Sequence, residues 1–288
     1  MASRPRTLPA AVAPVLVGTA AAVETSEELR VGAFVAALVG SVFIQIGTNL
    51  ANDYSDAKRG ADSIDRLGPV RVTASGLVAP RRVLVATWVA FGVAVAAGAY
   101  LIAVAGFVIL AVGVASILAG VLYTGGPRPY GYAGLGEAFV FLFFGLVAVN
   151  GSYYVQLERL DWLPFALSIP VGFLATAILV VNNVRDLDTD RRAGKLTLAV
   201  RLGRPRARLL YTGLVAGAYL GLPIALAATR GTAWGLIALG SLPLTLRPLQ
   251  AVRTRTDGAS LNAALAGTGA ALAAYSVLLT CGLLLGAS

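Results

Sequence analysis

Two short acidic stretches contain the side chains that could do chemistry in this chain. Asn52 and Asp56 lie four residues apart, as do Asn182 and Asp186, so each pair shares one face if its segment is helical. Clustered carboxylate and amide oxygens suit a hard divalent cation, and Mg²⁺ completes its shell with water and phosphate oxygens. The acids that flank these pairs are Asp53, Asp62, Asp188 and Asp190.

Basic side chains beside the clusters would supply the counter-charges of a diphosphate. A metal ion and cations together stabilise the charge that develops on such a leaving group. The sequence has no histidine and one cysteine, which excludes imidazole catalysis, Ser-His-Asp triads, an intrachain disulfide and paired-Cys metal sites. The basic residues concerned are Lys58, Arg59, Arg66, Arg71, Arg185 and Lys195.

Composition and the length of the apolar runs indicate a polytopic membrane protein. Only 13% of the residues are charged and 57% are hydrophobic, whereas about a quarter are charged in an ordinary soluble domain. The runs predict an all-α bundle of about nine transmembrane helices forming a single domain over residues 1–288. We expect the first helix to be retained rather than cleaved, because Pro9 and Pro14 interrupt its apolar run. The expected spans are 8–23, 31–55, 83–105, 107–123, 134–155, 162–184, 207–229, 233–249 and 261–285.

The basic residues are distributed unevenly between the two sides of this bundle. Arg30, Arg159 and Arg230 are the basic residues of one side, and the rest of the 23 lie on the other. The positive-inside rule then places the N-terminus and both acidic clusters on the cytoplasmic side of the plasma membrane. We therefore attribute the net charge of +9 to topology and anionic lipids, not to nucleic acid.

The two acidic stretches also suggest an internal duplication. The copies lie near residues 31–123 and 162–249, and each contains an apolar helix that ends in Asn-x-x-x-Asp. Two similarly oriented copies are typical of a bundle with a pseudo-symmetric site between its halves. The coincident residues are Phe43 with Phe173, Asn52 with Asn182, and Asp56 with Asp186.

Five segments in order resemble the UbiA superfamily of intramembrane aromatic prenyltransferases, with its paired Asp-rich motifs. The resemblance covers nearly the whole chain. The hydroxybenzoate branch usually has a third Asp four residues after Asp56, where this chain has Gly60 and then Asp62. That departure favours the branch that acts on 1,4-dihydroxy-2-naphthoate in menaquinone biosynthesis. The segments are 4–18, 49–62, 65–71, 123–137 and 182–198.

This resemblance implies a helical bundle with a central cavity, cytoplasmic loop caps and a lateral opening for a lipid tail. The implied reaction joins the prenyl group of a polyprenyl diphosphate to 1,4-dihydroxy-2-naphthoate, with loss of diphosphate and CO2, giving demethylmenaquinone. Mg²⁺ is the implied cofactor. The implied metal ligands are Asn52, Asp53, Asp56, Asp62, Asp186 and Asp190; the diphosphate-binding residues are Lys58, Arg66, Arg71, Arg185, Lys195 and Asn182; Asp56, Asp186 and Tyr123 are catalytic; and Tyr130 and Glu137 belong to the substrate loop.

Several other interpretations stay open at this point. The acids could be solvated helix ends, and Tyr54, Tyr130 and Tyr132 could be interfacial anchors. The acceptor could be a homogentisate or a hydroxybenzoate. A cation-coupled transporter would also need carboxylates, although transporters tend to place them near the midplane on broken helices.

Overall fold

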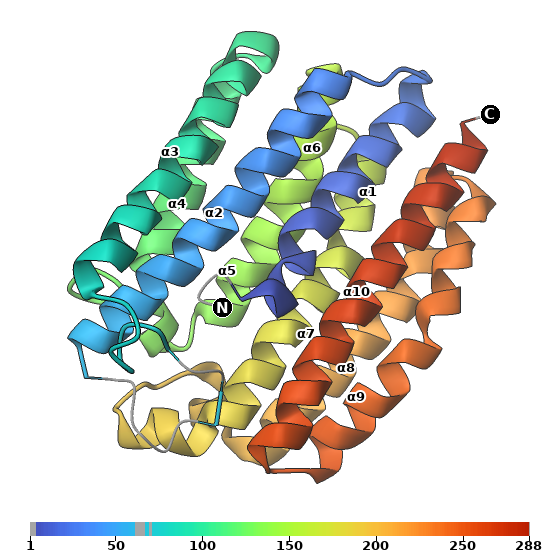
Figure 1. The fold of residues 1–288 in the computed structure, drawn as a ribbon. Coiled ribbons are helices and arrows are strands. Elements are labelled where there is room, and N and C mark those ends of the chain that lie inside the picture. Colours follow the sequence, from blue (N-terminus) through green and yellow to red (C-terminus); the bar gives the residue numbers. More distant parts are fainter. Residues whose placement is uncertain (1–3, 61–66, 69–70, 288) are drawn as a thin grey trace.

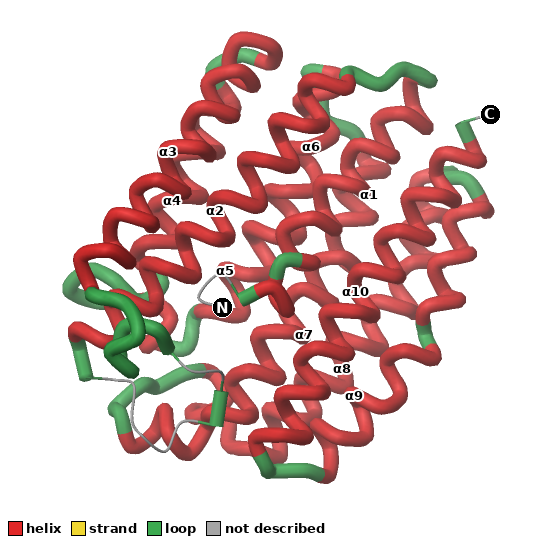
Figure 2. Tube along the Cα trace, viewed as in Figure 1, coloured by secondary structure: helices red, strands yellow, loops and turns green. Residues whose placement is uncertain are grey.

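Apolar runs of bilayer length become long helices in the computed structural model, which describes residues 4–60, 67–68 and 71–287. Within these ranges the chain is helical and has no strand (Figures 1 and 2). The elements are η1 (Pro5–Thr7), α1 (Pro9–Ser26), α2 (Val31–Lys58), α3 (Pro80–Ala105), α4 (Val108–Leu122), η2 (Tyr130–Ala133), α5 (Gly136–Val140), η3 (Phe141–Val147), α6 (Ala148–Leu157), α7 (Trp162–Arg192), α8 (Leu198–Thr229), η4 (Ala233–Ser241), α9 (Pro243–Thr254) and α10 (Gly258–Gly286).

The membrane-length segments match the prediction of about nine spans. Among the described residues, seven segments are long and apolar enough to cross a bilayer. One of these is continuous from α5 through η3 to α6. Helices η4 and α9, bent by 46°, are long and apolar enough only as a pair, which brings the number to eight if the pair is one span. Helix α4 has only 15 residues but lies where the fourth span is expected. Counting α4 therefore gives nine segments in this part of the chain.

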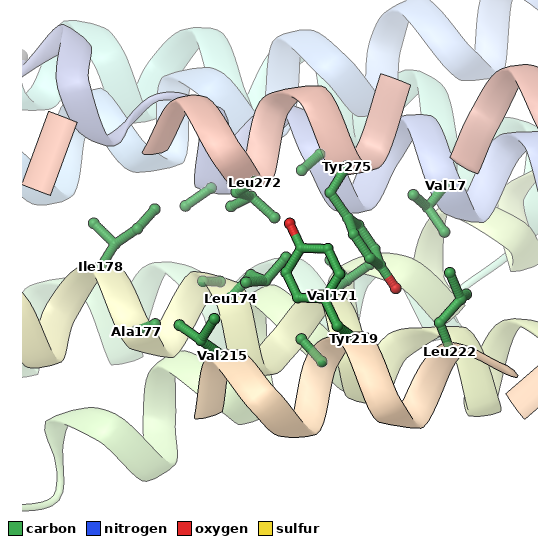
Figure 3. Packing of buried hydrophobic residues seen from close by; sticks show 14 of the residues in the cluster. Val17, Val171, Leu174, Ala177, Ile178, Val215, Tyr219, Leu222, Leu272 and Tyr275 are labelled. Carbon is green, nitrogen blue, oxygen red and sulfur yellow. The ribbon is translucent and has the colours of Figure 1, made fainter. Parts of the chain in front are cut away.

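Helix α7 is the centre of the bundle because it is apolar around almost its whole circumference. Its Leu167, Val171 and Leu174 are fully buried. In Figure 3, Val171 and Leu174 lie between α8 and α10, which contribute Tyr219 and Tyr275. These two tyrosine rings meet edge to face, with centroids 5.5 Å apart. The central helix thus has little freedom to move relative to its neighbours.

The motif helices extend further than the apolar pattern predicts. The expected ends were residues 55 and 184, but α2 continues to Lys58 and α7 to Arg192. Each helix is followed by a glycine in the left-handed region, Gly60 with φ 65° and Gly194 with φ 71°, which suits a helix C-terminus. The two motif ends lie at the same end of the bundle (Figure 1). Asp53 and Asp56 are therefore on α2, and Asp186, Asp188 and Asp190 are on α7, where the helical repeat sets the direction of each side chain.

Two further boundaries differ from expectation. Helix α8 begins at Leu198 rather than at 207, with a kink at Gly203 where φ is 75°. The predicted fifth span contains a π-helical segment, η3, where Gly145 packs directly against Gly172 of α7. A Cβ on Gly145 would lie 2.8 Å from the Gly172 Cα, so only glycine fits at this contact.

Candidate active site

A cavity of about 390 Å³ lies between the ends of α2 and α7 that carry the acidic motifs. Its wall includes Asp56 from α2, Asp186 and Asp190 from α7, and Arg71 and Lys195 from the segments that follow these helices. The remaining wall is largely apolar. Two acidic stretches that are far apart in the sequence therefore face one space, with basic side chains between them.

Asp56 is buried and bonded to three donors. Its Oδ2 accepts a hydrogen bond from Arg71 Nη2 at 2.9 Å and lies 3.1 Å from Lys195 Nζ. Its Oδ1 accepts the hydroxyl hydrogen of Tyr132 at 2.7 Å. A buried carboxylate requires such pairing to offset its desolvation. Since Lys195 follows the second motif, this contact joins the two motifs directly.

The segment after α7 is fixed so that Lys195 reaches Asp56. The Lys195 amide donates to the Asp190 carbonyl at 2.8 Å, and the Leu196 amide donates to the Tyr132 carbonyl at 3.0 Å. Lys195 Nζ lies 4.8 Å from the centroid of the Tyr132 ring, within the range of a cation-π contact. We expected Tyr132 to be an interfacial anchor, yet its hydroxyl donates to Asp56 and its ring contacts Lys195, so it positions both side chains.

Asp53 and Asn52 have different surroundings from Asp56. Both Asp53 oxygens accept backbone amides, from Val72 at 3.2 Å and from Thr73 at 3.0 Å. Asp53 is not part of the cavity wall, as far as the structure describes it. Asn52 lines the cavity, and its Oδ1 accepts the hydroxyl of Thr124 at 2.8 Å. Asp53 thus anchors the segment that carries Arg71.

Asp186 is paired with the neighbouring Arg185, which is 2% exposed. Arg185 Nε donates to Oδ1 at 2.8 Å and Nη2 donates to Oδ2 at 2.6 Å. The same guanidinium donates at 2.8 Å to Asn182 Oδ1 and to Asn262 Oδ1 of α10. Asn262 also donates to the Leu67 carbonyl at 2.9 Å, so it links the two motif regions. Sequence reasoning did not identify Asn262, because no local pattern marks it.

The remaining acids of the second motif point in different directions. Asp190 lines the cavity, as its spacing of four from Asp186 predicts. The Asp188 side chain is 63% exposed and pairs with Arg204 at 2.6 Å, away from the cavity. Asp188 is therefore a natural control for substitutions at the cavity acids.

Four aromatic side chains, Tyr123, Tyr130, Phe139 and Phe143, form part of the cavity wall. Tyr123 and Tyr130 meet edge to face at 5.4 Å, and Tyr130 stacks on Phe139 at 3.9 Å. Phe139 in turn stacks on Phe143. Burial raises the pKa of Tyr130 above its usual value of 10.0, and its hydroxyl donates to the Ala119 carbonyl at 2.9 Å. Such ring faces can stabilise a developing allylic cation.

Among the described residues, Glu137 and Lys58, like Asp53 and Arg185, are predicted site residues that are not part of the cavity wall. Glu137 is buried behind it, where Oε1 accepts Asn183 Nδ2 at 2.8 Å. Lys58 is exposed and does not line the cavity. Asp62 and Arg66 lie outside the described residues.

The donor set fits a metal ion that is shared with a substrate. Within the described residues, no group of three or more acidic or Cys side chains is arranged to hold a metal. Mg²⁺ typically takes only one or two protein carboxylates and completes its shell with water and phosphate oxygens. Asp56, Asp186 and Asp190, with the amide oxygens of Asn52 and Asn182, line the cavity and supply this kind of oxygen ligand.

Comparisons with known proteins agree with the family resemblance and with the fold. The model of the UbiA prenyltransferase family matches residues 11–268. A 1,4-dihydroxy-2-naphthoate octaprenyltransferase from Mycobacterium tuberculosis is 44% identical over 275 residues, covering 96% of this chain and 92% of that protein. The protein of the same name from Escherichia coli is 38% identical over 270 residues, which cover 90% of this chain and 86% of that protein. The structure of a UbiA homolog from Archaeoglobus fulgidus bound to GPP and Mg²⁺ matches with a TM-score of 0.63 at 16% identity. The match covers 97% of this chain and 98% of that chain, so the two share the fold.

Proposed function

Because this chain belongs to the UbiA prenyltransferase family, we propose that it transfers a polyprenyl group from an allylic diphosphate to 1,4-dihydroxy-2-naphthoate. The observation that carries this proposal is the contact of Lys195 with Asp56, which brings both acidic motifs to one cavity. The cavity continues from this charged end into an apolar depth, as an amphiphilic lipid diphosphate requires. The relatives named for this reaction cover nearly the whole chain.

Different side chains of the cavity would bind the metal ion, the phosphate oxygens and the allylic group. Asp56, Asp186 and Asp190 would hold Mg²⁺, which neutralises charge on the leaving diphosphate. Lys195 and Arg71 lie beside Asp56 and would pair with the phosphate oxygens. The wall of Tyr123 and the neighbouring rings would shield the allylic cation from water. Asp53 keeps the segment of Arg71 in place, and Arg185 orients Asp186.

The reaction balances without any further reactant. The allylic C–O bond breaks with its electron pair leaving on the diphosphate, and the ring carbon that bears the carboxylate attacks the allylic carbon. Loss of CO2 returns the electron pair of the broken C–C bond to the ring and restores the aromatic hydroquinone. The product is the reduced form of demethylmenaquinone.

We further propose that the motif end of the bundle faces the cytoplasm in the plasma membrane. Basic residues are concentrated in the segments at this end, and the positive-inside bias favours that orientation. The like-oriented motifs at the ends of α2 and α7 support the proposal that the two halves of the chain arose by duplication.

Substitution of the cavity acids tests this function. Purified protein with Mg²⁺, geranyl diphosphate and 1,4-dihydroxy-2-naphthoate should yield a prenylated product and one CO2 per turnover, and EDTA should stop both until Mg²⁺ is restored. Asp56→Ala and Asp186→Ala should each abolish transfer, whereas Asp188→Ala should retain it because that side chain points away. Near-normal turnover by either cavity variant would refute the two-motif site. If product forms only with 4-hydroxybenzoate or homogentisate, that compound is the acceptor in place of 1,4-dihydroxy-2-naphthoate.

A further inference from the structure

A strip of polar side chains continues from the acidic motif into the apolar depth of the cavity. Gln45, Asn49, Asn52 and Asp56 share one face of α2 and all line the cavity. At 1.5 Å per residue, the strip extends about 16 Å along the helix axis from Asp56 to Gln45. Neither the diphosphate, which has its own cations at the motif end, nor a hydrocarbon tail accounts for polar groups at this depth.

The N-terminal turn covers this strip from the opposite side. Thr7 Oγ1 accepts Gln45 Nε2 at 3.2 Å and lies 3.5 Å from Asn49 Nδ2. The turn itself packs on α10 (Figure 1). There the Arg6 carbonyl lies close to Gly269. As a result, η1 is part of the cavity wall within the bundle.

Arg4 brings a positive charge to this wall. It lines the cavity, and its backbone is left-handed, with φ 48° and ψ 70°. That conformation is costly for a residue other than glycine and persists only where the surroundings fix it. Thr7 fixes it here, because its amide and its hydroxyl both donate to the Arg4 carbonyl, at 2.9 and 3.0 Å. The strained turn is held in the conformation that places Arg4 at the cavity.

The ligand that fits Arg4 beside this strip is an aromatic acid. A guanidinium binds a carboxylate through two parallel hydrogen bonds, and the amides of Gln45 and Asn49 suit ring hydroxyls. We propose that Arg4, Thr7, Gln45 and Asn49 form the acceptor subsite, in which Arg4 binds the carboxylate of the aromatic substrate. This inference rests on the proposed function and adds to it the group that selects a carboxylated acceptor.

Steady-state kinetics of Arg4→Gln separate this role from diphosphate binding. Initial rates are measured against 1,4-dihydroxy-2-naphthoate and, separately, against geranyl diphosphate. Loss of a charged hydrogen-bond partner should raise the acceptor KM roughly 10- to 100-fold, while the KM for geranyl diphosphate changes less than about twofold. Arg6→Gln is the matched control, because Arg6 lies in the same turn but is exposed and away from the cavity.

An inhibitor without the carboxylate tests the specific contact. Naphthalene-1,4-diol should inhibit the wild type and Arg4→Gln with equal Ki, because it has no carboxylate for Arg4 to bind. Equal weakening of diol and acid would show a structural role, and a raised KM for geranyl diphosphate would place Arg4 at the phosphates; either result overturns the inference. Arg4→Lys keeps the charge and should raise the acceptor KM several-fold, so it carries the same test if Arg4→Gln does not fold.

The wild type distinguishes the two levels of the proposal. A wild type that prenylates 1,4-dihydroxy-2-naphthoate, together with an Arg4→Gln variant of unchanged acceptor KM, would refute the subsite and leave the function standing. A wild type that forms no product with this acid would refute the proposed function and the subsite with it.

Discussion

Substitution of Asp53 separates two roles that a buried acid beside the first motif could have. The family resemblance implies a metal ligand, whereas in the structure both carboxylate oxygens accept backbone amides, those of Val72 and Thr73. Asp53 is 2% exposed, so water cannot readily replace these bonds. We expect Asp53→Ala to release the segment that carries Arg71 and to leave the affinity for Mg²⁺ largely unchanged.

The size of this effect follows from the two hydrogen bonds. Each bond from an amide to a carboxylate contributes about 1.5 kcal/mol net, so their loss costs about 3 kcal/mol. Since 1.4 kcal/mol corresponds to a factor of ten, the population of the released segment should rise roughly 100-fold. Asp53→Asn keeps one side-chain acceptor oxygen and should give an increase of about tenfold.

Hydrogen exchange measures the release directly. Mass spectrometry of the peptide containing Val72 and Thr73 should show exchange faster by these factors in the two variants, and a Mg²⁺ titration of activity should give an unchanged half-maximal concentration. Asp188→Ala is the control, because Asp188 pairs with Arg204 on an exposed face and should leave exchange in this peptide unaltered. Unchanged exchange in Asp53→Ala, together with a Mg²⁺ requirement raised tenfold or more, would contradict the anchoring role and favour a metal ligand.

Two further predictions concern Asn262, which no motif marks, and Tyr130 of the substrate loop. Asn262→Ala removes one hydrogen-bond acceptor of Arg185 and the donor to the Leu67 carbonyl. A loss of about 1 to 1.4 kcal/mol should lower kcat/KM roughly 5- to 10-fold. Asn262→Asp keeps the acceptor for Arg185, so its kcat/KM should fall less. Burial raises the pKa of Tyr130, so above about pH 10 its phenol ionises in the unfolded chain before it does in the folded one, and stability falls. Tyr130→Phe should therefore lose less stability than the wild type when denaturation is followed from pH 9 to 11; an equal loss would show that Tyr130 does not contribute.

The sequence predicts the spans and the paired acids well because both depend on local periodicity. Apolar runs of bilayer length form the expected helices, and residues four apart, such as Asp186 and Asp190, line the same cavity. Helix ends are less predictable, since charged residues end an apolar run without ending the helix. Both motif helices continue until a glycine can take the left-handed conformation, at Gly60 and Gly194.

The partners of the acids could not be predicted, because they come from segments that only the fold brings together. Asp53 and Asp56 belong to one motif, yet one binds the backbone near Thr73 and the other binds Lys195 and Tyr132. The helical pattern places these two acids, three residues apart, at neighbouring positions on α2, but it says nothing about which groups lie beside each of them. Contacts between distant segments also account for Asn262, which shows no local signal at all.

The pairing of the cavity acids with cations of the same chain explains why the two kinds of residue share one space. Asp56 is held by Arg71 and Lys195, and Asp186 by Arg185. A diphosphate arriving alone would draw Arg71 and Lys195 away and leave a buried carboxylate without a counter-charge, which is costly. A divalent cation arriving alone at Asp56 would face two positive side chains at close range. When both arrive together, the carboxylates turn to the metal ion and the basic side chains to the phosphates, so every buried charge keeps a partner. This arrangement therefore favours binding of the diphosphate and the cation as a pair.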